Sequence, residues 1–376
     1  MGDYVRPMQV EGKSTRTIWL EPDGWSVGII DQTRLPHHFA TARLASLEDA
    51  VRAISSMQVR GAPLIGATAA YGVCLALRRD ASDASLERAC AMLLTTRPTA
   101  INLKWALDEM SAAVRNRPRQ QRLAEAYRRA GAICDEDVAI NRAIGRHGAE
   151  LIAAIAGKKR ARKPVQVLTH CNAGWLATVD FGTALAPIYV AREHGMSVHV
   201  WVDETRPRNQ GAALTAWELG QSGVAHTVIA DNTGGHLMQH GMVDLILVGT
   251  DRVTANGDVC NKIGTYLKAL AAKDNGVPFY VGAPSPSIDF AVCDGIAEIP
   301  IEQRAGDEVA TVTGRAADGR IETVRVVPER AQVANFAFDV TPARLVSGLI
   351  TERGVLKANR AALAAAFPER TARAAE

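Results

Sequence analysis

The chain has 376 residues, of which 47% are hydrophobic and 22% are charged, as in an ordinary globular protein. Its 43 basic and 40 acidic residues give a formal net charge of +3, too balanced for a dedicated nucleic-acid-binding protein. At about 150 residues per domain, the length predicts two domains and a sizeable core. The composition excludes a disordered or low-complexity chain.

The sequence offers no segment suited to spanning a membrane. The longest uncharged stretch, residues 61–77, contains Pro63 and three glycines and is shorter than the roughly 20 residues of a transmembrane helix. The N-terminus lacks the apolar core of a secretory signal. Six widely spaced cysteines without a C-x-x-C pair indicate reduced thiols rather than disulfides or a zinc site. These features predict a cytoplasmic protein without a bound metal.

The first 145 residues are expected to form a smaller α+β domain. Two extended segments, 17–20 and 25–30, flank the turn sequence Asp23-Gly24, which predicts an antiparallel pair, and mostly helical sequence follows. Two basic runs, 115–119 and 158–163, lack interleaved aromatic residues. They are typical of solvated helix ends or linkers rather than of a nucleic-acid surface.

From about residue 164 the chain alternates short β-branched segments with helical ones. Strands are predicted at 165–169, 197–203, 226–231, 243–250 and 277–282, and helices at 182–193, 211–222, 234–240 and 260–273. The segment 243–248 is apolar on both faces, as expected for a strand covered by helices on two sides. The pattern predicts an α/β fold class, with a Rossmann-like, doubly wound parallel sheet in a C-terminal domain of residues 146–376.

Ligands collect beyond the carboxyl ends of the strands in such a sheet, and Cys171, Gln210 and Asp251 lie in those loops. A lone cysteine is usually a structural thiol, and Asp251 could simply cap its loop, but their positions favour chemical roles. His170 precedes Cys171, yet neighbours in an extended segment point to opposite faces, which disfavours a Cys–His pair.

Several basic residues are placed where an anion would bind. Gln210 follows Arg206 and Arg208 at the start of the helix predicted at 211–222. Lys262 lies near the start of the helix predicted at 260–273, so both helix starts suit a phosphate. The alternative is that these cations are ordinary surface charges. No G-x-G-x-x-G or P-loop motif occurs, which argues against a dinucleotide cofactor and against P-loop chemistry.

The first domain offers two similar positions. Arg60 stands beside Gly61 and Ala62, whose small size permits close approach of the backbone, and Arg97 precedes Pro98 at a predicted helix start. Both segments could be plain loops that begin helices. The functional interpretation is that they bring phosphate or hydroxyl donors to a pocket between the domains.

As a set, residues 60–66, 97–103, 170–174, 205–211 and 249–253 resemble the motifs of methylthioribose-1-phosphate isomerases, the aldose–ketose isomerases of methionine salvage. The resemblance extends from about residue 16 to residue 342. It implies that Cys171 and Asp251 are the catalytic pair. It also implies a substrate site made of Arg60, Gly61, Ala62, Arg97, Gln210, Asn261 and Lys262. A small sugar phosphate as the partner, no cofactor or metal, and a homodimer are further implications.

The implied reaction converts 5-methylthioribose 1-phosphate to 5-methylthioribulose 1-phosphate by acid-assisted ring opening and hydrogen transfer from C2 to C1. Trp175, directly after the catalytic loop, is expected near the non-phosphorylated end of the substrate. One alternative is an isomerase for 5-deoxyribose 1-phosphate or ribose 1,5-bisphosphate. Another is a non-catalytic, sugar-phosphate-sensing regulatory subunit like those of the initiation-factor exchange complex, in which the full set of site residues would be idle.

Overall fold

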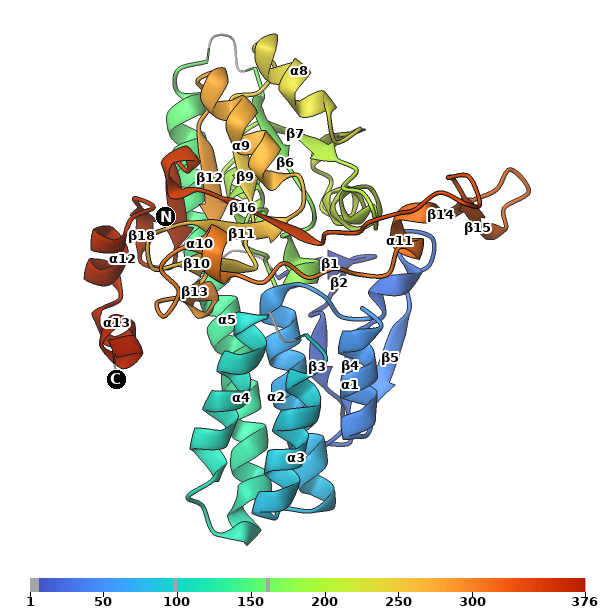
Figure 1. Cartoon of the computed structure of the whole chain (residues 1–376), viewed down its shortest axis with the longest axis vertical. Helices are drawn as coiled ribbons and strands as arrows, with labels where there is room; N and C mark the ends of the chain where they lie inside the picture. The colour runs from blue at the N-terminus through green and yellow to red at the C-terminus, as the bar shows by residue number, and fades with distance from the viewer. Residues whose placement is uncertain (1–6, 98–99, 160–162, 376) are drawn as a thin grey trace.

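A computed structural model describes residues 7–375, except 98–99 and 160–162. Figure 1 shows the helices of the N-terminal half at one end of the molecule and a large α/β layer at the other. Helix α5 (Arg119–Ala156) runs from one end to the other as 38 continuous residues. The domain boundary predicted between residues 145 and 146 falls inside this helix.

The N-terminal half combines small antiparallel sheets with helices. Its strands are β1 (Gln9–Val10), β2 (Lys13–Ser14), β3 (Ile18–Leu20), β4 (Val27–Ile30) and β5 (Thr41–Leu44). The predicted pair is confirmed, because β3 and β4 are antiparallel neighbours around Asp23, whose carboxylate accepts the backbone N–H groups of Trp25 and Ser26 at 2.9 Å. The short helix η1 (Gln32–Arg34) lies between β4 and β5, and the helices that follow are α1 (Leu47–Ser55), α2 (Ala62–Arg79), α3 (Asp83–Leu94) and α4 (Ile101–Val114).

A seven-stranded sheet forms the C-terminal half, in the order β18-β17-β12-β9-β6-β7-β8. Its strands are β6 (Val165–Thr169), β7 (Val198–Asp203), β8 (Ala225–Ile229), β9 (Leu245–Val248), β12 (Phe279–Gly282), β17 (Gly348–Thr351) and β18 (Gly354–Leu356). All neighbouring pairs are parallel except β17 with β18. The five predicted strands and the Rossmann-like sheet are therefore confirmed.

Helices cover both faces of this sheet, as the apolar strand sequences indicate. Along β9, Leu245 and Leu247 pack into the core that contains α5 and α6 (Ala186–Glu193). The alternate residues Ile246 and Val248 pack into a second core with α8 (Thr233–Gln239) and α9 (Thr265–Asp274). Alternate side chains of this one strand thus pack into two separate hydrophobic cores, one on each face of the sheet.

A second, four-stranded sheet lies beside the large one, in the order β13-β10-β11-β16. It consists of β10 (Arg252–Thr254), β11 (Val259–Lys262), β13 (Ile288–Asp289) and β16 (Phe338–Thr341). The helix predicted at 260–273 is therefore wrong at its start, because residues 259–262 pair antiparallel with β10 and β16 and the helix begins only at Thr265. Pairing with a distant segment overrides the local pattern here.

The remaining elements are short. They are η3 (Trp175–Ala177), the π-helical turn η4 (Gly211–Thr215) with α7 (Ala216–Gln221), η5 (Ser285–Ser287), α10 (Gly295–Glu298), α11 (Asp307–Ala310), η6 (Ala343–Leu345), α12 (Arg360–Ala366) and α13 (Pro368–Ala375). Strands β14 (Thr311–Arg315) and β15 (Ile321–Arg325) form a hairpin that extends away from the body in Figure 1.

The basic run at 115–119 is exposed and joins the end of α4 to the start of α5, as predicted. In the other basic run, residues 160–162 lie outside the described part of the chain. Within the described ranges, no helix combines the length and the apolarity that crossing a membrane requires.

Candidate active site

The candidate site lies where the order of the large sheet reverses. From β6 the chain proceeds to β7 and β8 on one side, and then to β9 and β12 on the other. The loops after β6, β7 and β9 carry Cys171, Gln210 and Asp251, and they meet in the crevice that such a reversal creates.

One cavity brings together every site residue that the family resemblance implies. Its lining includes Arg60, Gly61, Ala62, Arg97, Cys171, Gln210, Asp251, Asn261 and Lys262. The first four come from the N-terminal half of the chain and the other five from the C-terminal half. The site is therefore composite, and neither half contains all of it.

The backbone of Cys171 is held in an uncommon conformation. Its φ is +65°, which is costly for a residue other than glycine unless the surroundings fix it. The Cys171 N–H donates to Thr205 Oγ1 at 2.8 Å, and the Thr215 hydroxyl donates to the Cys171 carbonyl at 2.7 Å. These bonds on both sides of the residue aim its side chain into the cavity.

The Cys171 thiol and the Asp251 carboxyl share an environment that favours their neutral forms. Burial raises the pKa of Cys171, although Arg60 and Lys262 act in the opposite direction, and its Sγ–H donates to Gln210 Oε1 at 3.4 Å. The Asp251 side chain keeps some exposure to the cavity. Dense packing around it nevertheless raises its pKa, against the pull of Lys262 and other cations. Both pKa shifts favour the protonated form of the group.

Three cations surround this pair. Arg60 donates to the carbonyl of Asn172 at 2.8 Å, and Arg97 forms an ion pair with Glu302 at 3.3 Å. The Nε–H groups of Arg60 and Arg97 are buried and have no hydrogen-bond partner among the described residues. Lys262 places its ammonium 4.7 Å from the centre of the Phe338 ring, and burial lowers its pKa. An anionic ligand would satisfy these donors.

The start of helix α2 adds backbone donors to the same cavity. Gly61 has φ of +91°, and a Cβ there would lie 2.4 Å from the Ala177 carbonyl oxygen, so a side chain does not fit. No side chain caps this 18-residue helix, and Ala62 and Pro63 line the cavity. Uncapped N–H groups and the helix dipole favour an anion at this point.

Two of the sequence interpretations are wrong in detail. Asn261 and Lys262 lie on strand β11 rather than at a helix start, so Lys262 reaches the cavity from a sheet. Arg206 and Arg208 are not among the residues lining this cavity, because Arg206 donates to the Val309 carbonyl at 2.7 Å and Arg208 pairs with Glu308 at 2.8 Å.

Trp175 also differs from the expectation. It is fully buried, does not line the cavity, and packs against Trp217 with the ring centres 6.0 Å apart. Its place is the hydrophobic core of the protein rather than the cavity.

A mostly apolar recess adjoins the cavity beside Asp251. Its apolar lining consists of Ala62, Ile65, Ala100, Cys260, Ile299, Pro300 and Phe338, and Arg97, Asp251 and Arg252 complete it. Ile299 and Phe338 come from segments that no sequence motif had marked as part of a site. Glu302, the partner of Arg97, was missed for the same reason.

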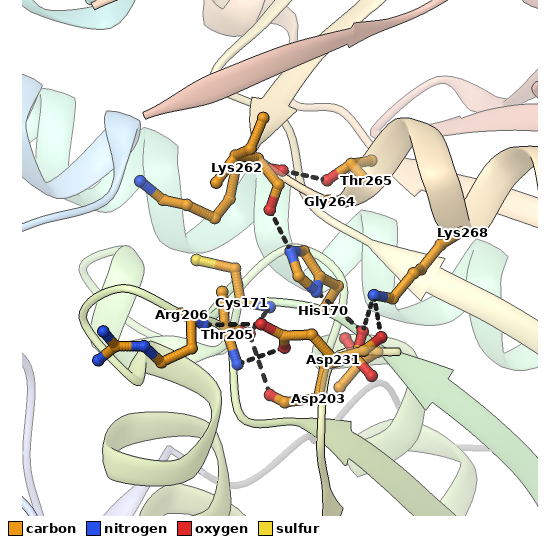
Figure 2. A network of polar contacts seen from close by, with 12 residues as sticks. His170, Cys171, Asp203, Thr205, Arg206, Asp231, Lys262, Gly264, Thr265 and Lys268 are labelled. Carbon is orange, nitrogen blue, oxygen red and sulfur yellow. Dashed lines mark hydrogen bonds and ion pairs between the residues drawn. The ribbon is translucent and has the colours of Figure 1, made fainter. Parts of the chain in front are cut away.

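Within the described residues, His170, Asp203 and Asp231 offer potential metal-ligand atoms within 4.8 Å of one another. Lys268 already places its ammonium 3.1 Å from Asp203 Oδ2, and it also donates to the Asp231 carbonyl, as Figure 2 shows. The Lys268 ammonium thus already supplies the positive charge that a metal ion would bring. The cluster therefore does not fit a metal centre.

Comparison with known proteins identifies the family. A model of the Initiation factor 2 subunit family matches residues 58–358. The chain is 64% identical to the methylthioribose-1-phosphate isomerase of Methylocella silvestris, covering 97% of this chain and 100% of the relative. It is 65% identical to the protein of the same name from Paramagnetospirillum magneticum, over 96% and 100%. The chain belongs to the Initiation factor 2 subunit family.

Within the Initiation factor 2 subunit family, two solved structures are close to this fold. One is 5-methylthioribose 1-phosphate isomerase from Pyrococcus horikoshii, with a TM-score of 0.82 and 37% identity over 98% of this chain and 100% of that one. The other is the delta subunit of translation initiation factor eIF-2B from A. fulgidus, with a TM-score of 0.76 and 36% identity over 94% and 100%. The family resemblance expected from the motifs is thereby confirmed.

Proposed function

We propose that this protein isomerises 5-methylthioribose 1-phosphate to 5-methylthioribulose 1-phosphate, an aldose–ketose step of methionine salvage. The observation that carries the proposal is one cavity in which a buried thiol, a partly buried carboxyl and three cations meet. The names of the relatives at 64% and 65% identity support it.

The cations and the start of α2 are assigned to the phosphate. Arg60, Arg97 and Lys262 offer charged donors, and two buried Nε–H groups lack partners among the described residues. Fixing the phosphate, which takes no part in bond changes, supplies binding energy for positioning the sugar carbons.

Ring opening is assigned to Asp251. Because the anomeric oxygen carries phosphate, the sugar cannot open to a free aldehyde, and the ring oxygen has to be protonated first. Burial raises the pKa of Asp251, which favours the protonated form that a proton donor requires.

Hydrogen transfer from C2 to C1 is assigned to the neighbourhood of Cys171. As a thiolate, Cys171 would remove the C2 proton and lead through an enol phosphate. As a thiol, it would stabilise the charge that develops at the C2 oxygen while hydride moves to C1. Its hydrogen bond to Gln210 and its raised pKa favour the thiol form in the free site.

The apolar recess favours a methylthio group over a second phosphate. C5 is attached to C4, which carries the ring oxygen, so the C5 substituent falls beside the acid that protonates this oxygen. The recess next to Asp251 is lined largely by apolar side chains, including Ile299 and Phe338, and its two arginines are already paired, Arg97 with Glu302 and Arg252 with Asp289. A thioether gains from burial there, whereas a phosphate would lose its hydration.

The proposal is tested by incubating the purified protein separately with 5-methylthioribose 1-phosphate, 5-deoxyribose 1-phosphate and ribose 1,5-bisphosphate. NMR of C1 and C2 follows the conversion of each aldose to a ketose. We expect the highest kcat/KM with the methylthio sugar. Preference for the bisphosphate, or no conversion of any of the three, would overturn the assignment. No conversion would favour the regulatory alternative, to which the 36% identical initiation-factor subunit gives some weight.

Three further expectations accompany this proposal. The chain is expected to act as a homodimer in the cytoplasm, and its two functional halves are expected to divide near residue 145. Light scattering on the purified protein at several concentrations tests the dimer, and a monomer at all of them would contradict it.

A further inference from the structure

A buried polar cluster lies directly behind the catalytic loop and has no part in the steps above. At its centre is His170, which is 1% exposed and immediately precedes Cys171. Its Nδ1 lies 2.8 Å from Asp203 Oδ2, and its Nε2 lies 2.8 Å from the carbonyl oxygen of Ile263, as Figure 2 shows. Both ring nitrogens are therefore engaged, and neither is available to accept the proton of Cys171.

The Ile263 carbonyl can only accept a hydrogen bond, so Nε2 donates to it, while Nδ1 lies against the Asp203 carboxyl. Asp203 on β7 is fully buried and also pairs with Lys268 on α9 at 3.1 Å. Two further carboxylates complete the surroundings. Asp231 accepts backbone N–H groups of the Thr205 loop, and Asp339 accepts those that follow Ile263.

The ring joins two segments that are far apart in the sequence. On one side is the loop after β6 that carries Cys171. On the other is the turn after β11, where Ile263 directly follows Asn261 and Lys262. Gly264 brings this turn against the ring, because it has φ of +101° and a Cβ there would lie 3.0 Å from His170 Cε1.

We propose that His170 is a positioning residue, which through Asp203 and the Ile263 carbonyl holds Cys171 and Lys262 in fixed relation across the site. The inference rests on the proposed function, since that function gives Cys171 a role in hydrogen transfer and Lys262 a role in phosphate binding. A shift of about 1 Å between such groups is enough to slow catalysis by about 100-fold.

The kinetic test uses His170→Phe, which keeps a ring but removes both hydrogen bonds, and His170→Gln, which keeps one donor group. The matched control is His147→Phe, since His147 Nδ1 also lies against a backbone carbonyl, that of Thr351 at 2.9 Å, outside the site. We expect His170→Phe to lower kcat and raise KM, each by about tenfold or more, and His170→Gln to restore part of both. The His147 variant should stay within about twofold of the parent.

A double-variant comparison separates positioning from general loss of structure. If His170 acts on substrate binding through Lys262, His170→Phe should change KM by less than about twofold when Lys262 is already replaced by Met. A purely structural role predicts instead that the two effects multiply. Multiplying effects, or a His170→Phe variant that matches the His147 control, would overturn the proposal.

A second readout does not depend on the isomerase reaction. The rate at which iodoacetamide alkylates Cys171 is measured against pH by peptide mass spectrometry, in the parent and both His170 variants. In the His170 variants the Lys262 ammonium should no longer be held near Cys171. The midpoint of the alkylation profile should then move upward by on the order of 1 pH unit. An unchanged midpoint would refute the role of His170, whereas a parent that alkylates normally but isomerises none of the sugars would refute only the proposed function. If His170→Phe does not fold, His170→Gln decides the question.

Discussion

Arg97 and Glu302 form an ion pair at the edge of the candidate active-site cavity, with Nη2 and Oε2 3.3 Å apart. The arginine comes from the loop before α4 and the glutamate from the segment after α10, so the pair joins the two halves of the chain. It orients the guanidinium before any substrate is bound.

We predict that Arg97→Ala raises KM by about 10- to 100-fold, the effect of losing a hydrogen bond to a charged group. Glu302→Gln keeps a side-chain oxygen for Arg97 and serves as the control, with KM expected within about threefold of the parent. Steady-state kinetics with 5-methylthioribose 1-phosphate gives both values. An unchanged kcat/KM in Arg97→Ala would remove this residue from the site.

Replacing the proposed acid should affect the chemical step rather than binding. Asp251→Asn keeps the size and polarity of the side chain but removes the titrating proton, so kcat should fall by about two to four orders of magnitude with little change in KM. The thermal unfolding curve of the variant checks that it is folded. A kcat within about threefold of the parent would contradict the assignment.

Two replacements of Cys171 distinguish a role as a thiol from a role as a thiolate. Because burial raises its pKa and Sγ–H donates to Gln210, we expect a hydrogen-bonding thiol. Cys171→Ser should then retain part of kcat, whereas Cys171→Ala should lose about two to four orders of magnitude. Equal loss in both variants, together with solvent deuterium at C1 of a product formed in deuterated water, would indicate a thiolate base instead.

The apolar recess predicts how specificity responds to a new charge. Ile299→Lys places a cation in the recess, so kcat/KM for 5-methylthioribose 1-phosphate should fall by about tenfold or more, while that for ribose 1,5-bisphosphate should rise. Ile296→Lys is the matched control, because Ile296 is 69% exposed nearby on α10. Equal changes for both sugars in Ile299→Lys would argue against this placement of the C5 substituent.

Stability should fall between mildly acidic and mildly alkaline pH because of a buried carboxyl. Burial raises the pKa of Glu218 from 4.5 to about 7, although the Leu176 N–H and the Tyr189 hydroxyl stabilise its charge. The folded state therefore keeps this proton longer than the unfolded chain. Its stabilising effect is complete below pH 4.5 and is lost as the pH rises through about 7.

The corresponding experiment compares Tm at pH 5 and pH 8. Glu218→Gln removes the titration, so the decrease in Tm between these values should be smaller than in the parent. Glu150→Gln, on the exposed side of α5, is the control and should reproduce the parent profile. An identical profile in Glu218→Gln would show that this carboxyl is ionised in the folded protein at both pH values.

Local sequence was sufficient for much of the architecture. The five predicted parallel strands and the first antiparallel pair follow from β-branched runs and turn residues, which act within a few positions. Cys171, Gln210 and Asp251 line one cavity because they lie in the loops at the carboxyl ends of strands, and Gly61 and Ala62 reach it from the start of α2. These features depend on short-range chemistry.

The errors arose where distant segments decide the structure. Residues 259–262 form a strand because they pair with residues 338–341, about 80 positions away, and no local pattern encodes that partner. Glu302 approaches Arg97 only in the folded chain. Trp175 is buried in the core, where it packs against Trp217, although its position in the sequence suggested that it would line the substrate pocket.

Helix α5 sets a limit on how the protein can be rearranged by design. Near its start, the Tyr127 hydroxyl donates to the Trp25 carbonyl at 2.6 Å, and near its end a Cβ on Gly148 would lie 2.3 Å from Pro187 Cγ. The same helix thus packs against both halves of the chain. Chimaeras between relatives should cross over before Arg119 or after Ala156. A junction inside α5 would combine helix surfaces from two relatives, each of which packs against the residues of its own protein.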